Sequence, residues 1–236
     1  MKLVFHYIIL FTLISLIACH SPMQINGYEP IVYSVNTQSL DTLNAIEQSL
    51  VPYRAQLSAT MNQVIANAEG DFKKEKPNST LGNLVAKAVY DFAKTKDTTI
   101  YAAIINYGGI RLPEIKKGII TRGKIFELLP FDNEIVIVPV KGTDLKTWMQ
   151  QIANSGGWPV WSSEFISIQQ ETLGKTIKDE NTYQIATIDY VANGGDDCDF
   201  LKKYPKQYYQ ALLRDIVINT LEVQKNIFPN NRKTLE

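Results

Sequence analysis

Two short, uninterrupted apolar runs constrain the fold of this chain more than any other feature. Residues 99–105 and 135–140 carry almost no polar side chains. A run of this length without polar alternation is typical of a strand that is covered on both faces of a sheet. Such strands need covering helices, so the rest of the sequence has to supply them.

Apolar residues that recur every three or four positions predict four such helices. The first spans residues 40–66 and is expected to lie on the core, with Pro52 kinking or dividing it. The second begins near Ser79 or Thr80, the third is capped by Thr143 and ends at residues 156–157, and the last starts at about residue 207. The apolar faces are Leu43, Ile46, Leu50, Tyr53, Leu57, Met61 and Val64; Leu81, Leu84, Val85, Ala88, Val89 and Phe92; Leu145, Trp148, Met149 and Ile152; and Leu212, Leu213, Ile216, Val217 and Leu221.

Residues 165–168 and 183–188 alternate between apolar and polar, as half-exposed strands do. The order of helices and strands shows no regular alternation. We therefore predict an α+β fold, a single domain with a mixed β-sheet packed with helices.

The N-terminus has the pattern of an export signal. Lys2 precedes an apolar run over residues 3–17, which is too short for a membrane span of ~20 residues. It ends in Leu16-Ile-Ala-Cys19, which resembles the lipobox of bacterial lipoproteins, and this resemblance implies lipidation of Cys19. An ordinary thiol behind an ordinary signal peptide is the alternative.

These patterns give the expected organisation: a signal peptide over residues 1–18, a lipidated cysteine and tether over 19–39, a folded domain over 40–225, and a frayed polar tail over 226–236. The expected location is the bacterial cell envelope, lipid-anchored to the membrane and facing the periplasm or the exterior.

Charge and composition narrow the chemistry. Lys plus Arg and Asp plus Glu number 24 each, so the sequence carries no footprint of a nucleic-acid partner. If Cys19 carries lipid, only Cys198 remains and no internal disulfide forms. The two histidines are His6 and His20, so the predicted domain offers no base for a serine or cysteine nucleophile. We therefore predict no catalytic residue, no metal ligand and no cofactor in this chain. A pair of carboxylates of the kind that glycosidases use is left open, because acidic residues are plentiful but no motif selects a pair.

The loop Asn106-Tyr-Gly-Gly-Ile-Arg111 directly follows the first apolar run. Gly108 and Gly109 permit positive φ and a close approach of backbone to a ligand. Arg111 offers a planar fork of donors for hydroxyl or carboxylate partners. The alternative is a glycine turn whose arginine is held by a structural acid.

Two further loops carry an aromatic residue and polar groups. In Leu129-Pro-Phe-Asp-Asn133 the aromatic residue is Phe131, and in Asp189-Tyr-Val-Ala-Asn-Gly-Gly-Asp196 it is Tyr190. The two rings are candidates to stack on a base, and Asp196 is a candidate acceptor for a ribose diol. The alternatives are a core plug for Phe131 and a calcium loop around Asp196, although the spacing fits no EF-hand.

These loops resemble the C-terminal domain of 5′-nucleotidases, as do Ser79-Thr-Leu-Gly-Asn-Leu84 and Gly156-Gly157-Trp-Pro159. The resemblance runs from about residue 40 to 199 and implies a nucleoside pocket. In it, the base would lie between Phe131 and Tyr190, where Tyr190 replaces a usual phenylalanine. The remaining implied roles are Asn106 and Asn133 near the base or ribose, Arg111 near the ribose, Asp196 on the ribose hydroxyls, and Gly157 beside the base.

The chain departs from that family in two respects. Lys74 and Lys76 occupy the region where the family often has an arginine, which puts that ribose contact in doubt. The family's two-metal phosphoesterase centre belongs to a separate N-terminal domain rich in Asp, Asn and His, and residues 1–39 leave no room for it.

The resemblance therefore implies a nucleotide-binding subunit that hydrolyses nucleoside 5′-monophosphates together with a separate metallophosphatase, which would hold the divalent metal ions. Its partners would be a nucleoside or nucleotide, the metallophosphatase and the membrane. The alternatives are a non-catalytic nucleoside-binding lipoprotein of the cell envelope, and a structural protein whose pocket serves another ligand.

Overall fold

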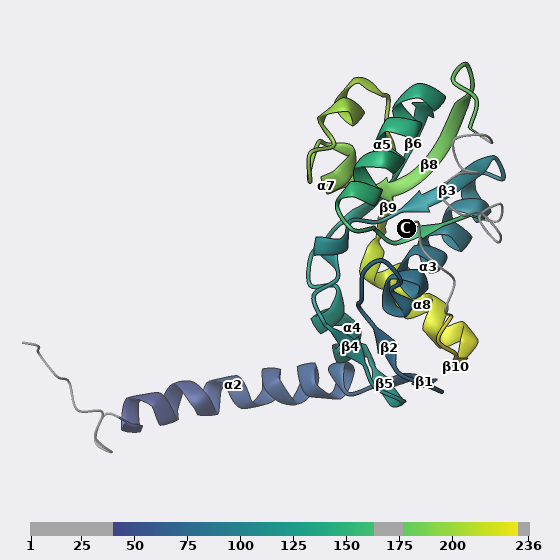
Figure 1. Ribbon diagram of the computed structural model, residues 1–236. Coiled ribbons are helices and arrows are strands. Elements are labelled where there is room, and N and C mark those ends of the chain that lie inside the picture. The colour runs from purple at the N-terminus through teal and green to yellow at the C-terminus, as the bar shows by residue number, and fades with distance from the viewer. Residues whose placement is uncertain (1–39, 163–176, 231–236) are drawn as a thin grey trace, which may run out of the picture. The chain divides into compact units, whose positions relative to one another are not determined.

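The computed structural model describes residues 40–162 and 177–230 (Figure 1). The predicted signal peptide and tether, the strand expected at 165–168 and the last six residues lie outside this part. The chain divides into two compact units, Met1–Leu50 and Val51–Glu236. The second unit contains residues 51–225 of the predicted domain and is an α+β structure.

The first helix, α2 (Leu40–Met61), differs from its prediction in three ways. It continues through Pro52 as one helix, and it ends before β1 (Val64–Ala68), whose first three residues were expected to be helical. Its apolar residues Ile46, Tyr53 and Leu57 are 53%, 72% and 58% exposed, so they do not lie on a core. Apolar periodicity shows which face of a helix is suited to burial, but it does not show what buries it.

A five-stranded sheet in the order β7-β3-β8-β6-β9 forms the centre of the domain. Its strands are β7 (Val160–Trp161), β3 (Ile100–Ile104), β8 (Thr182–Ile188), β6 (Glu134–Lys141) and β9 (Gln207–Leu212). Strand β3 is parallel to β8, and the other neighbours are antiparallel. The two apolar runs therefore form strands at the predicted places.

Two elements of this sheet correct the sequence-based expectations. Strand β8 lies between β3 and β6, and its last four residues are buried without alternation. Residues 207–212 form the edge strand β9, and the closing helix α8 (Leu213–Gln224) begins only after it. The apolar residues at the end of this short strand continue the spacing of the helix that follows it. The sequence pattern therefore predicts one long helix where the structure has a strand and a helix.

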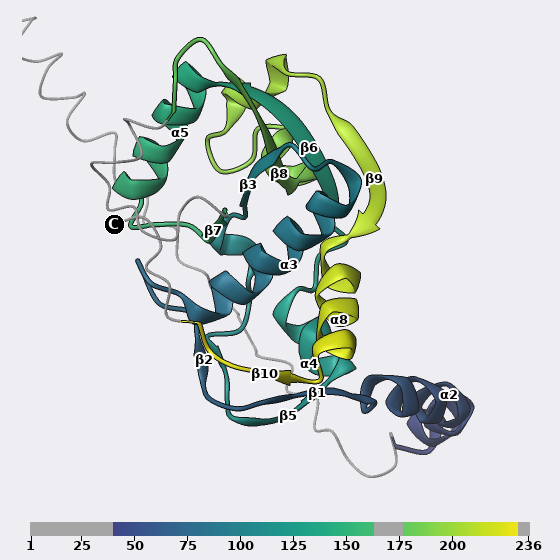
Figure 2. The ribbon, with the colours of Figure 1, turned by 90° about the vertical axis from the view of Figure 1, so that its right-hand side faces the viewer.

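Helices cover both faces of the sheet, as the buried strands require. Figures 1 and 2 show α5 (Gly142–Asn154) over one face, and α3 (Thr80–Lys96) and α8 over the other. The residues that α3 buries include Leu81, Val85 and Val89, while α5 buries Trp148. Thr143 lies inside the first turn of α5 and not at its cap, which is Lys141.

Below this sheet lie smaller elements that join distant parts of the chain. β1 pairs with β5 (Gly118–Thr121) on one side and with β10 (Asn226–Ile227) on the other. Ile227 is buried, so the segment expected to be a frayed tail begins as part of a sheet. β2 (Phe72–Lys73) pairs with β4 (Glu114–Ile115), and α4 (Arg122–Leu128) follows β5.

The start of α3 depends on Ser79, whose side chain is buried. Its Oγ accepts a hydrogen bond from the backbone N–H of Gly82 at 2.8 Å and donates one to the Lys73 carbonyl at 3.1 Å. We expect Ser79→Ala to lower the free energy of unfolding by ~1 kcal/mol, because a helix N–H loses its cap. Urea unfolding measures this, with the exposed Ser49→Ala as control. An unchanged midpoint for Ser79→Ala would contradict the capping role.

Candidate functional site

The sheet topology brings four loops to one edge. β3 and β8 are parallel, so the loops after Ile104 and after Ile188 leave the sheet on the same side. β6 and β7 are antiparallel to these strands, and their registers place Ile135 beside Ile188 and Val160 beside Ile104. The loops that precede β6 and β7 therefore reach the same edge, which explains how segments far apart in sequence form one site.

Asp196 is the centre of a hydrogen-bond network at this edge. Its Oδ2 accepts a hydrogen bond from Asn106 Nδ2 at 2.7 Å, and its Oδ1 accepts one from the Tyr190 hydroxyl at 3.1 Å. The hydrogen bond to Asp196, and then the negative charge of that carboxylate, raise the pKa of Tyr190 above its ordinary value. Asn106 is buried, and its Oδ1 has no hydrogen-bond partner within the described part of the chain.

The backbone around Asp196 adopts a conformation that few residues accept. Gly194 has φ +96°, while Asp196 and Asp197 have φ +50° and +62°. Asp and Asn tolerate the left-handed region better than most residues. A Cβ on Gly195 would lie 2.4 Å from the Tyr190 ring. The absence of a side chain at residue 195 therefore lets the ring of Tyr190 lie against the loop that carries Asp196.

Arg111 and Phe131 form the second group of the site. The Arg111 guanidinium carbon lies 5.8 Å from the centroid of the Phe131 ring, and Nη1 donates to the Gly108 carbonyl at 3.2 Å. No carboxylate lies within ion-pair distance of Arg111 in the described residues, which does not support the alternative of a structural acid. Phe131 is 49% exposed and thus is not a core plug.

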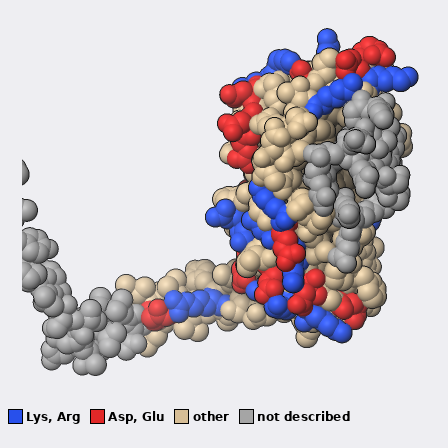
Figure 3. Space-filling model, in the orientation of Figure 1, with Lys and Arg blue, Asp and Glu red and all other residues tan. Residues whose placement is uncertain are grey.

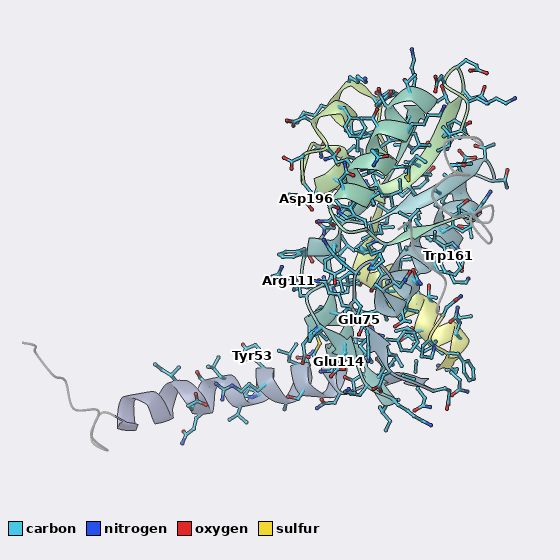
Figure 4. All side chains as sticks on the ribbon, in the orientation of Figure 1. Tyr53, Glu75, Arg111, Glu114, Trp161 and Asp196 are labelled. Atoms are coloured by element: carbon cyan, nitrogen blue, oxygen red, sulfur yellow. The ribbon has the colours of Figure 1, made fainter. Side chains whose placement is uncertain are left out.

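The two aromatic side chains are both available to a ligand. Tyr190 sits in the short helix α7 (Asp189–Ala192) and is 49% exposed, like Phe131. Among the ring contacts of the described residues, none joins Phe131 to Tyr190. Figure 4 shows Arg111 and Asp196 on the same flank of the domain.

Two predicted site residues do not join these groups. Asn133 is half-buried, and its backbone carbonyl accepts a hydrogen bond from Leu213 N at 2.9 Å. Gly157 is buried with φ +96°, and its N–H donates to the Ile152 carbonyl at 2.9 Å, which ends α5. Neither of them hydrogen-bonds to another predicted site residue. Their roles toward a ligand stay predictions.

Lys74, whose region left a ribose contact in doubt, lies beside the loop of residues 106–111. Its Nζ donates to the Ile110 carbonyl at 2.6 Å and lies 4.4 Å from the centroid of the Tyr107 ring. Burial, and then the charges of Arg111 and Lys76, lower the pKa of Lys74. The pairing of β2 with β4 brings Lys74 to this loop, and no local pattern in the sequence indicates that pairing.

Charges around the site are separated. Figure 3 shows acidic side chains gathered over α7 and the loop after it, which includes Asp196, Asp197 and Asp199. The basic side chains gather elsewhere in the site. Lys74 and Lys76 lie over the Tyr107 ring, and the charge of Arg111 acts on Lys74. The acidic side suits the hydroxyl groups of a sugar, because hydroxyl groups donate hydrogen bonds to carboxylates.

Other features of the described residues lie apart from this chemistry. Cys198 is buried behind the loop, and burial followed by the charge of Asp196 raises the pKa of its thiol to about 12. No group of three His, Cys, Asp or Glu side chains suited to a metal ion occurs in residues 40–162 and 177–230. A groove of about 540 Å³ between α3, β9 and α8 is lined by none of the predicted site residues.

Comparison with known proteins agrees with this architecture. Residues 60–162 match the family model described as 5′-nucleotidase, C-terminal domain. An apyrase of Anopheles gambiae is 25% identical over 233 residues, which cover 87% of this chain and 40% of the apyrase. Protein UshA of Yersinia enterocolitica is 27% identical over 164 residues, which cover 65% of this chain and 28% of UshA. The chain thus spans less than half the length of these relatives.

Solved structures extend the comparison. A 5′-nucleotidase precursor from Thermus thermophilus superposes with a TM-score of 0.65 at 26% identity, covering 82% of this chain and 43% of that one. The NAD nucleotidase of Haemophilus influenzae shares the fold with a TM-score of 0.58 at 15% identity, covering 83% of this chain and 44% of that one. Over residues 60–162 the chain is therefore similar to the C-terminal domain of 5′-nucleotidases, and it shares the fold of these solved structures. Within the described residues, no helix is long and apolar enough to cross a membrane.

Proposed function

We propose that this domain binds the nucleoside part of a nucleotide and acts as the substrate-binding subunit of a 5′-nucleotidase-type hydrolase for nucleoside 5′-monophosphates. One observation carries the proposal: a carboxylate oriented by Asn106 and Tyr190 lies at the same sheet edge as the exposed pair of Phe131 and Arg111. A ribose diol donates to such a carboxylate, and an exposed ring stacks on a base.

The position of the Asp196 carboxylate suggests how a nucleotide would lie in the site. The sugar hydroxyls would meet Asp196, Arg111 would lie near the ribose, and the 5′-phosphate would point outward from the pocket. In this orientation the 5′-phosphate projects away from the base-binding rings. A metallophosphatase could then reach it without displacing the nucleoside.

The proposal assigns the hydrolytic step to a separate metallophosphatase. Two-metal hydrolysis needs ligands that hold both ions ~3.5–4 Å apart, and the histidines of this chain are His6 and His20, outside the predicted domain. The residues of this chain bind and orient the substrate, and the partner would supply the metal ions and the nucleophilic water. The alternative, capture of nucleosides without hydrolysis, uses the same pocket.

Calorimetric titration of the chain in the presence of a chelator tests the proposal. We expect saturable binding of adenosine and of AMP with similar affinities, because the nucleoside supplies the contacts and the phosphate points outward. Absence of binding by both ligands would overturn the proposed pocket. Phosphate release from AMP by this chain alone, with divalent metal ions added, would overturn the assignment of catalysis to a partner.

We also propose that Cys19 anchors the protein to the membrane of a bacterial cell, since Leu16-Ile-Ala-Cys19 resembles a lipobox. We expect Cys19→Ser to move the protein from the membrane fraction to the soluble fraction, because the lipid cannot be attached. Fractionation of cells expressing either form measures this. Continued membrane retention of the Cys19→Ser protein would refute the anchor.

A further inference from the structure

Helix α2 presents an apolar stripe that the described part of the chain leaves exposed. Ile46, Leu50, Tyr53 and Leu57 are 53%, 39%, 72% and 58% exposed, and Tyr53 projects outward from α2 in Figure 4. Soluble proteins seldom leave a contiguous row of large apolar side chains in water unless the row binds something.

The spacing of this stripe specifies the kind of surface that it fits. Positions 43, 46, 50, 53 and 57 are separated by three, four, three and four residues, which is the a and d pattern of a coiled coil. Pro52, with its missing N–H, falls at an outward-facing position of this repeat and leaves the stripe intact. The matching surface is therefore another helix with the same spacing.

We propose that α2 pairs with α2 of a second copy of this chain in an antiparallel coiled coil. In this arrangement Leu50 packs against Tyr53 of the partner subunit, and Ile46 packs against Leu57 of the partner subunit. The helix has 22 residues, or ~33 Å at 1.5 Å per residue. Two such helices bury the whole stripe along each other.

The charged residues beside the stripe favour a second copy of α2 as its partner, and they favour an antiparallel pair. Glu47 and Arg54 each follow a d position of the repeat. In an antiparallel pair these flanking positions face each other, so Glu47 lies beside Arg54 of the partner subunit, and twofold symmetry forms this contact twice. In a parallel pair Glu47 would face Thr42 and Arg54 would face Ser49, without any opposite charge. The helix is thus complementary to itself in one direction only.

Sedimentation of the full chain in a mild detergent, over a range of concentrations, tests the pairing. We expect a reversible dimer and an increase of at least ~10-fold in its dissociation constant for Leu50→Gln, because each copy loses a buried leucine. Val51→Gln is the matched control, since Val51 is 57% exposed on the same helix but lies outside the stripe. A monomeric wild-type chain, or a dimer that tolerates Leu50→Gln as well as Val51→Gln, would overturn the proposal.

Reversing the charge of residue 47 or of residue 54 tests whether the two helices run antiparallel. Glu47→Arg alone and Arg54→Glu alone place like charges together, and we expect each to weaken its own homodimer by roughly 10-fold. A mixture of the two variants should form a heterodimer of at least wild-type affinity, because every flanking pair then has opposite charges. If both single variants dimerise like the wild-type chain, the antiparallel pairing is wrong.

Discussion

Replacing Asp196 by asparagine should weaken adenosine binding by ~10–100-fold while changing the binding of free adenine by less than ~2-fold. Hydrogen bonds to a charged group contribute ~1.5–3 kcal/mol, and the amide presents an N–H where the carboxylate offered an oxygen. In the free protein this carboxylate already accepts hydrogen bonds from Asn106 and Tyr190. Its orientation is therefore set before the ligand arrives, and the loss falls on the contact with the sugar.

Asp197→Asn provides the control for this experiment. Asp197 is adjacent, is exposed and has a similar left-handed φ of +62° against +50° for Asp196. Asparagine tolerates that conformation, so both variants keep the loop. Calorimetry measures the affinity of each of the two variants for adenosine and for adenine. Equal losses of both ligands for Asp196→Asn, or equal effects of the two substitutions on adenosine, would contradict the role of Asp196 toward the ribose.

Replacing Phe131 by alanine should weaken the binding of adenosine and of adenine alike, by ~1–3 kcal/mol or ~5–150-fold, because stacking involves the base and not the sugar. The fold should be maintained, because the ring is half-exposed and its contact is with Arg111. This pattern is the reverse of that expected for Asp196→Asn. The two variants together separate the base half of the pocket from its sugar half.

The control for Phe131→Ala is Phe228→Ala, which removes a phenylalanine that is 71% exposed and has no predicted ligand role. Unchanged affinity of Phe131→Ala for both ligands would refute the stacking model. A loss for adenosine without one for adenine would show that residue 131 acts on the sugar instead. Thermal unfolding of both variants checks that the folded state is intact.

The sequence predicted the elements whose pattern depends on local burial. Residues 100–104 and 134–141 form strands where continuous apolar runs were found, and Ser79 caps a helix where its type and position indicated one. Prediction was wrong where burial depends on a neighbour. β8 is central because β3 and β6 lie on either side of it, and residues 207–212 are a strand because β6 offers an edge.

In the candidate site, too, the sequence predicted local features but not the contacts between distant segments. The residue types in its loops indicated a polar pocket with aromatic rings, and the family resemblance implied roles for them that stay predictions. The contact between Asn106 and Asp196 joins residues 90 positions apart, and it exists because β3 and β8 are parallel neighbours. The placement of Lys74 depends on the pairing of β2 with β4, for which the sequence contains no local signal.

The pairing of β1 with β10 has a consequence for synthesis on the ribosome. The strand that opens the domain, Val64–Ala68, receives one of its two neighbours only when Asn226 and Ile227 have been made. At ~5–20 residues per second, that edge of β1 stays unpaired for roughly 10–30 s after the strand itself is complete. The nascent domain can pack its central sheet earlier, but its lower sheet closes only with the last residues of the fold.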